Sequence, residues 1–88
     1  MERTRELRFV WPSFPRASGY RLELFRGGTR ILTADVDQPV FSLPHTWIDR
    51  GRAVTLGPGE YRVYVWAVVA GRYVREPVIQ ATLVAPRR

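Results

Sequence analysis

The segment Leu56-Gly57-Pro58-Gly59-Glu60-Tyr61-Arg62-Val63-Tyr64-Val65-Trp66-Ala67-Val68 decides the fold that we expect for this chain. A Gly-Pro-Gly turn leads into a strand whose side chains alternate between two faces. One face carries Tyr61, Val63, Val65 and Ala67, and the other carries Arg62, Tyr64, Trp66 and Val68. In a β-sandwich, a tyrosine at the head of such a strand buries its ring and turns its hydroxyl back to the preceding turn. We therefore expect a tyrosine corner at Tyr61 that fixes the crossover between two sheets.

The composition bounds the class of protein. The 88 residues make a single domain, 1–88, and 45% of them are hydrophobic, which supports a small folded core and excludes a disordered chain. There are no cysteines, so disulfides, thiolate zinc sites and cysteine nucleophiles are excluded. No run approaches the roughly 20 apolar residues of a membrane helix. The charged start, Met1 to Glu6, lacks the apolar stretch of a secretion signal. We expect a soluble chain, cytoplasmic if Met1 is the native start and in the envelope or extracellular if the chain is part of a larger protein.

The charge is strongly basic but dispersed. All 14 basic residues are arginines, and the net charge is +6. A GC-rich genome or selection for bidentate cations would each produce an arginine-only set. A positive charge favours anionic partners in general, but nucleic-acid binders usually gather their charge in one stripe. We therefore do not expect this chain to bind nucleic acid.

Turn signals divide the rest of the chain into short strands. We expect strands at 7–11, 20–25, 29–34, 40–43, 60–69 and 73–84, with a hairpin turn at Gly27-Gly28 and an interruption at Pro77. Residues 44–52 read as irregular, and 53–56 lead into the corner. No segment shows a helical period over ten residues, so the sequence predicts an all-β fold of six to seven antiparallel strands.

The order of these landmarks resembles a fibronectin type III domain, an immunoglobulin-like β-sandwich. Trp11 matches the tryptophan of that family's strand B, and Tyr20 matches the tyrosine of its strand C. Leu56, Pro58, Gly59 and Tyr61 match the turn into strand F. The resemblance covers residues 7–84 and is nearest to arginine-rich bacterial members. It implies structural roles for five residues: Trp11, Tyr20, Leu56, Gly59 and Tyr61.

Two features depart from the family. Only a few charged residues precede strand B, so strand A is missing or vestigial. An unpaired side of strand B would then be a template for another chain, unless Arg3, Arg5, Glu6 and Arg8 protect it or the residues before Leu7 form a short strand A. The segment before the corner is also longer than usual. Its Trp47 is either a plug at the open end of the sandwich or an exposed anchor for a partner.

No residue set has a catalytic or metal signature. His45 is the only histidine, and its neighbours Ser42 and Asp49 lie in the same predicted loop, which does not ensure the geometry of a triad. Asp35 and Asp37 read as turn residues rather than a calcium site. We expect no enzyme activity, no metal and no cofactor.

The outward row of the 60–69 strand is the best candidate binding surface. If it neighbours the 20–25 strand, as in the family, the face would carry Arg21, Phe25, Arg62, Tyr64 and Trp66. Tryptophan, tyrosine and arginine are enriched at binding hot spots. The alternative is that cross-strand pairing and arginine stems cover these rings.

The sequence thus favours a non-catalytic protein-interaction or spacer module that binds a protein partner or its own copy. The open strand B edge and the aromatic and arginine face are the two expected contact regions. A carbohydrate- or polyanion-binding module of the bacterial cell envelope is the alternative, with Trp66, Tyr64 and Trp47 as stacking platforms. Salt separates the two, because polyanion binding weakens steeply as salt rises.

Overall fold

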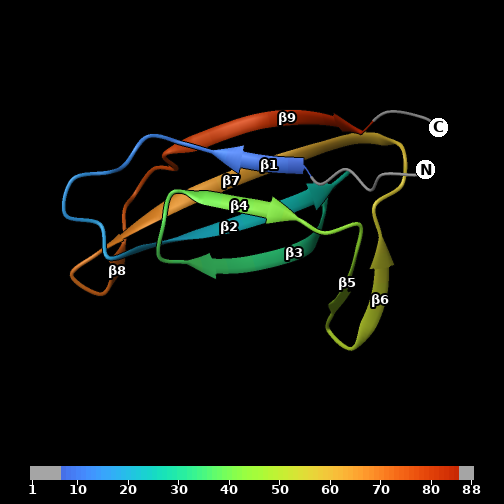
Figure 1. The fold of residues 1–88 in the computed structure, drawn as a ribbon, viewed down its shortest axis with the longest axis horizontal. Helices are drawn as coiled ribbons and strands as arrows, with labels where there is room; N and C mark the ends of the chain where they lie inside the picture. The colour runs from blue at the N-terminus through green and yellow to red at the C-terminus, as the bar shows by residue number, and fades with distance from the viewer. Residues whose placement is uncertain (1–6, 86–88) are drawn as a thin grey trace, which may run out of the picture.

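The computed structural model describes residues 7–85, and within them it contains antiparallel sheets and no helix (Figure 1). The all-β prediction is therefore confirmed. Because these residues form no helix, none of them belongs to an apolar helix of membrane-spanning length. The strands are β1 (Leu7–Val10), β2 (Gly19–Arg26), β3 (Thr29–Val36), β4 (Val40–Leu43), β5 (Thr46–Asp49), β6 (Arg52–Thr55), β7 (Gly59–Val69), β8 (Arg72–Tyr73) and β9 (Ile79–Ala85).

The strands form one larger sheet and two small ones. The larger sheet, here called the main sheet, has the order β3-β2-β7-β8, and β9 also pairs with β7. The pairs β1–β4 and β5–β6 form separate two-stranded sheets. The described residues hold nine strands rather than the expected six to seven. The excess arises because β5 and β6 were not expected and because the last strand is divided in two.

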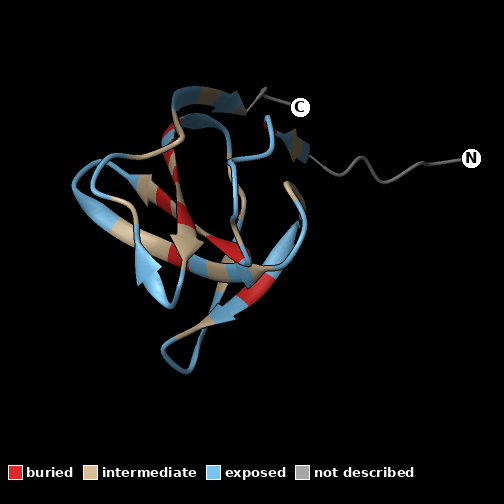
Figure 2. Ribbon diagram, turned by 90° about the vertical axis from the view of Figure 1, so that its left-hand side faces the viewer, coloured by how far each residue is buried: buried red, intermediate tan, exposed pale blue. Residues whose placement is uncertain are grey.

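Strict alternation makes β2 and β7 the centre of the main sheet. The inward side chains Tyr20, Leu22 and Leu24 of β2 are buried, as predicted, and so are Tyr61, Val63, Val65 and Ala67 of β7. Figure 2 shows the buried residues as separate bands along the strands. A one-residue shift in register would turn every one of these side chains to the opposite face. Burial of the inner row therefore fixes which residues point outward.

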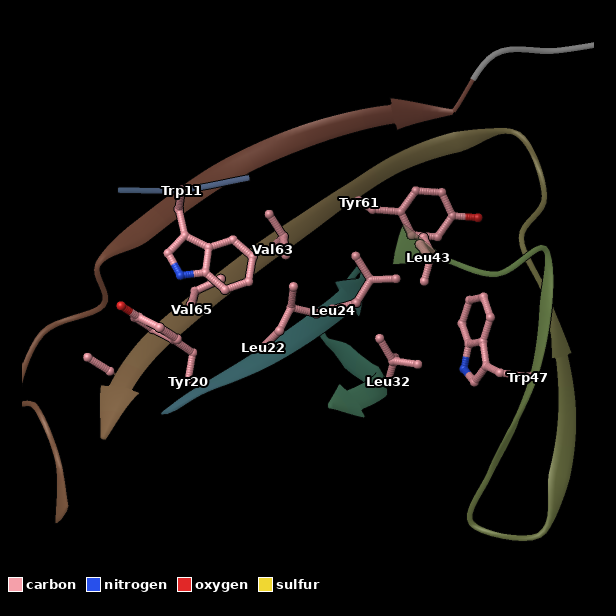
Figure 3. Packing of buried hydrophobic residues seen from close by; sticks show 11 residues of the cluster. Trp11, Tyr20, Leu22, Leu24, Leu32, Leu43, Trp47, Tyr61, Val63 and Val65 are labelled. Atoms are coloured by element: carbon pink, nitrogen blue, oxygen red, sulfur yellow. The ribbon is translucent and has the colours of Figure 1, made fainter. Parts of the chain in front are cut away.

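The core lies on the inner face of the main sheet (Figure 3). Leu43 of β4 and Trp11, which follows β1, belong to the same buried cluster as Leu22 and Val65 of the main sheet. The rings of Trp11 and Tyr20 meet edge to face, with centroids 5.5 Å apart. Each large apolar side chain buried in this way contributes roughly 1.5–3 kcal/mol. The core thus joins the β1–β4 pair to the main sheet.

The hydrogen bond that we expect between Tyr61 and its preceding turn is present. Tyr61 is buried, and its hydroxyl donates a hydrogen bond of 2.7 Å to the carbonyl oxygen of Gly57. The guanidinium of Arg26 lies 5.5 Å from the centre of the Tyr61 ring. Gly59 has a φ of 139°, a conformation that favours glycine and explains why the turn needs it. This set of contacts fixes the start of β7.

Tyr20 has a comparable role at the other end of the core. It is buried, and its hydroxyl oxygen accepts a hydrogen bond of 2.8 Å from the backbone N–H of Phe14. That bond holds the connection between β1 and β2 against the core. Of the other expected structural residues, Trp11 is buried, and Leu56 is half-buried with its backbone N–H bonded to the His45 carbonyl oxygen at 2.8 Å.

The prediction of an irregular segment at 44–52 is wrong. Thr46–Asp49 and Arg52–Thr55 pair as a hairpin whose two turn residues, Arg50 and Gly51, have φ angles of 53° and 79°. Positive φ at both central positions is the signature of a type I′ turn, whose twist matches that of the flanking strands. Arginine is an uncommon first residue in such a turn, which is why the sequence did not indicate a hairpin here.

The remaining turns follow the prediction more closely. Gly27-Gly28 joins β2 to β3, with Gly27 at a φ of 62°. The expected last strand divides into β8 and β9, and Pro77 lies in the gap between them. Arg3, Arg5 and Glu6, and with them any strand A, lie outside the described residues. Within residues 7–85, β1 pairs with β4 alone.

Candidate functional site

The pairing of β2 with β7 brings the five candidate binding residues onto one surface. Arg21 lies opposite Trp66, and Phe25 lies opposite Arg62. Tyr64 lies between them, opposite Glu23. We call the surface formed by Arg21, Phe25, Arg62, Tyr64 and Trp66 the aromatic–arginine face. It lies on the side of the main sheet opposite the core.

The three rings of the face form one contiguous cluster. Phe25 meets Tyr64 edge to face, with centroids 5.6 Å apart, and Tyr64 stacks on Trp66 at 5.8 Å and 19°. Each such pair contributes about 0.5–1.5 kcal/mol beyond the area it buries. All three residues are half-buried. Packing of Phe25 against Tyr64 across the two strands, and of Tyr64 against Trp66 along β7, therefore covers part of each ring and leaves part of it open to a partner.

Arg21 is held in place from two sides. Its Nε and Nη2 donate to the two carboxylate oxygens of Asp35 at 3.0 and 3.3 Å, and its guanidinium lies 5.1 Å from the centre of the Tyr73 ring. The hydrogen bond to Asp35 raises the pKa of Arg21 above its ordinary value. The Arg21 guanidinium is therefore held by the Asp35 carboxylate and packs against the ring of Tyr73.

Tyr73 was not among the predicted site residues. It reaches the face because it pairs with Val68, the outward residue that follows Trp66 along β7. The signal that would have found it is the tight turn at Ala70-Gly71, where φ is 53° and 78°, since a two-residue turn fixes this pairing.

The charges on the face balance locally. Arg30 donates to Glu23 at 3.2 Å, in addition to the pair between Arg21 and Asp35. Arg62 and Glu60 are both exposed, and neither forms an ion pair among the described residues. Among residues 7–85, the three arginines on this side of the sheet (Arg21, Arg30 and Arg62) are thus matched in number by three carboxylates (Glu23, Asp35 and Glu60). Together these six described residues carry no net charge, although the whole chain has a net charge of +6.

A shallow depression runs along the outward row of β7. Its volume is about 670 Å³, and it is lined by the glycine turn between β2 and β3, by Phe25 and by the outward residues of β7 from Glu60 to Trp66. It therefore presents aromatic rings with one exposed cation and one exposed carboxylate. The lining holds no nucleophile placed beside a base.

Trp47 does not form an exposed anchor. It lies on β5, is 9% exposed, and donates from Nε1 to the Ile31 carbonyl oxygen at 2.7 Å. Its ring packs in the core cluster with Leu32 and Leu43 (Figure 3). Of the two alternatives for Trp47, the structure favours the plug, because the hairpin brings the ring under the end of the sheet.

His45 is exposed in the connection between β4 and β5. No hydrogen bond links it to Ser42 or Asp49 among the described residues, and the carboxylate of Asp49 lies 4.0 Å from Arg50. In the same residues, no group of three or more His, Asp or Glu side chains is arranged to hold a metal ion.

Comparisons with protein-family models, with curated proteins and with solved structures find no match to this chain.

Proposed function

We propose that this protein is a non-catalytic interaction module with a fibronectin type III-like sandwich, and that it binds a protein partner through the aromatic–arginine face. The observation that carries the proposal is the ring cluster of Phe25, Tyr64 and Trp66 on the solvent side of the main sheet, with Arg62 exposed beside it.

The strand pairing supports the sandwich. We take β1, β2, β4 and β7 as strands B, C, E and F of the family. Strands C and F are then neighbours in one sheet, and Tyr61 lies at the start of strand F. Leu43 and Trp11 contribute core side chains from the side of the β1–β4 pair. Since this architecture hosts many unrelated tasks, the function has to be argued from the face itself.

The chemistry of the face favours a protein partner. Tryptophan, tyrosine and arginine carry a large share of the energy at protein interfaces, and they do so from partly preformed clusters. Here the rings hold one another, and Arg21 is fixed by Asp35 and Tyr73. Little side-chain entropy remains to be lost on binding, which favours affinity.

The local charge balance is an argument against a polyanion. Two of the three arginines on this side of the sheet are already paired with carboxylates, and the exposed Glu60 accompanies the third. A polyanion would gain few ion contacts here and would meet an unpaired carboxylate. The outer side of β1, unpaired among residues 7–85, is a second contact region within the same proposed function, with Arg8 as its single charged residue.

The test is affinity capture from an extract of the source cells, with three immobilised proteins compared. Trp66→Ala removes the largest ring of the aromatic–arginine face, and Ile48→Ala is the control, because it removes an exposed apolar side chain from the β5–β6 hairpin. We expect a protein retained by the wild type and the control but lost with Trp66→Ala. The dissociation constant of the recovered protein should then rise at least ~10-fold with Trp66→Ala.

Salt provides the second readout. Binding of a protein partner to a locally neutral face should change little between about 50 and about 200 mM salt, whereas polyanion binding falls steeply over that range. Thermal unfolding of each variant checks that the fold is retained. A partner that is retained by Trp66→Ala as well as by the wild type, or that is lost steeply as salt rises over that range, would overturn the proposal.

A further inference from the structure

β9 has the composition of a strand that another strand can extend. Its seven residues, Ile79–Ala85, contain no charge, no proline and no glycine. Such an uncharged, β-favouring segment at a sheet edge is a ready template for pairing. Within residues 7–85, β9 pairs with β7 alone, so one side of its backbone carries donors and acceptors without a strand partner.

Both faces of β9 are accessible. Gln80, Thr82 and Val84 on the outer side are exposed, with Val84 at 67%. On the inner side Ala81 is exposed, and Ile79 and Leu83 are half-buried against the core. An added strand would therefore need an apolar inner row that completes the core and a neutral outer row.

The other long edge of the main sheet is protected. β3 carries Arg30 and Asp35, and both are engaged in ion pairs with β2. A charge on an edge strand discourages pairing because an incoming strand would have to desolvate it. β9 carries no charged side chain, so the β9 edge lacks the protection against strand pairing that the β3 edge has.

We propose that β9 pairs with β9 of a second copy of this chain, antiparallel and about a two-fold axis at Thr82. Thr82 is the midpoint of the strand, so this register uses all seven residues. It places Thr82 opposite Thr82 of the other copy, Gln80 opposite Val84, and Ala81 opposite Leu83. Each residue is then opposite a residue on the same face of the sheet. The second copy supplies an apolar inner row and a neutral outer row because its sequence is identical.

The positive charge of the chain does not prevent this arrangement. Arg62 of β7 lies opposite Thr82 of β9. In the dimer the two copies of Arg62 would be separated by the β7–β9, β9–β9 and β9–β7 spacings, which together make about 14 Å. That separation exceeds the screening length of roughly 8 Å at physiological salt. The remaining repulsion between two basic molecules is screened further as salt rises, so the dimer should strengthen with salt.

The pairing closes on itself. A two-fold contact occupies the β9 edge of both copies and leaves the protected β3 edges outermost. An isologous contact of this kind makes a dimer rather than an open-ended fibre.

Sedimentation velocity over about 10 µM to about 1 mM protein is the first test. We expect the wild type to dimerise, and Thr82→Glu to weaken the dimer at least ~10-fold, because it sets two carboxylates directly opposite each other. In the monomer the new carboxylate faces Arg62, so the fold should be retained. The control is Thr29→Glu, which places the same charge on the β3 edge opposite Arg26 and should leave dimerisation unchanged.

Cysteine cross-linking tests the register. The chain has no cysteine, so Thr82→Cys introduces a single thiol. Directly opposite residues of antiparallel strands have Cα atoms about 4.5–5.5 Å apart, within disulfide reach. Two Gln80→Cys residues would be offset by about 14 Å along the strands. We expect rapid disulfide dimers from Thr82→Cys, and few from Gln80→Cys or from Thr33→Cys on β3.

Three results would overturn the proposal. One is a monomer at every concentration; another is cross-linking of Gln80→Cys or Thr33→Cys as fast as that of Thr82→Cys. The third is a dimer that withstands Thr82→Glu but is lost with Trp66→Ala, because that dimer would use the aromatic–arginine face. Loss of partner binding through that face would leave the β9 pairing intact, so the two proposals fail separately.

Discussion

The hydroxyl of Tyr61 and the carbonyl oxygen of Gly57, four residues earlier, are joined by a hydrogen bond of 2.7 Å. The bond ties the turn before β7 to the first buried residue of that strand. Tyr61 is only 1% exposed, so its hydroxyl makes this bond at the edge of the core rather than with bulk water. β7 pairs with β2, β8 and β9, so its start is the point on which the main sheet depends.

Tyr61→Phe should lower stability by about 1–2 kcal/mol, because the Gly57 carbonyl loses its partner while the ring stays in place. For a domain of this size that corresponds to a fall in Tm of roughly 4–8 °C per kcal/mol. Tyr73→Phe is the matched control, since Tyr73 is 52% exposed. Equal melting temperatures for Tyr61→Phe and the wild type would contradict the corner.

Trp47→Phe should cost about 1–2 kcal/mol, because it removes the hydrogen bond to the Ile31 carbonyl oxygen but keeps an aromatic ring in the core. Trp47→Ala should cost about 3–5 kcal/mol through loss of packing. Hydrogen exchange of the amides of residues 46–55 is the measurement, with Ile48→Ala on the same strand as the control. Faster exchange confined to other strands would show that Trp47 does not hold the hairpin.

Ala70→Asn should stabilise the protein by about 1 kcal/mol. Ala70 has a φ of 53°, a left-handed conformation that costs an alanine about that much and that asparagine tolerates. Ala70→Val should act in the opposite direction, since a β-branched residue is disfavoured there. Urea unfolding of both variants checks the sign of each change.

Asp35→Asn should change stability by less than about 1 kcal/mol, because the pair between Arg21 and Asp35 is largely solvent-exposed. The pKa of Arg21 is raised in the folded state. A raised pKa contributes stability that is complete below the unfolded-state pKa and is lost only as the pH rises through the folded-state value. For an arginine that window is strongly alkaline, so unfolding free energies between about pH 6 and pH 9 should not vary on account of Arg21.

The predicted fold was most accurate where one local signal sufficed. The alternation in β2 and β7 indicated which residues are buried, and the Gly-Pro-Gly turn indicated the corner. The sequence does not predict the β5–β6 hairpin, because Arg50 has a positive φ and arginine is not a residue type that indicates such a turn. The sequence is compatible with two roles for Trp47 for the same reason, since only the hairpin determines where its ring lies.

The candidate face was predicted in membership but not in arrangement. Alternation identifies Arg62, Tyr64 and Trp66 as outward, but it cannot say that Arg21 is held by Asp35 and covered by Tyr73. Those contacts join residues from three strands, and they depend on the register between strands. The local charge balance, which favours a protein partner over a polyanion, follows from the same register.

The sequence by itself determined the all-β character, the inner and outer rows of the central strands, and the tyrosine corner, because each depends on neighbours within a few residues along the chain. Only the tertiary structure decided the pairing of β2 with β7, the burial of Trp47 and the different protection of the β3 and β9 edges. Those properties arise when hydrogen bonding between strands brings distant residues together, and that pairing is chosen by the burial of the whole core rather than by any one segment.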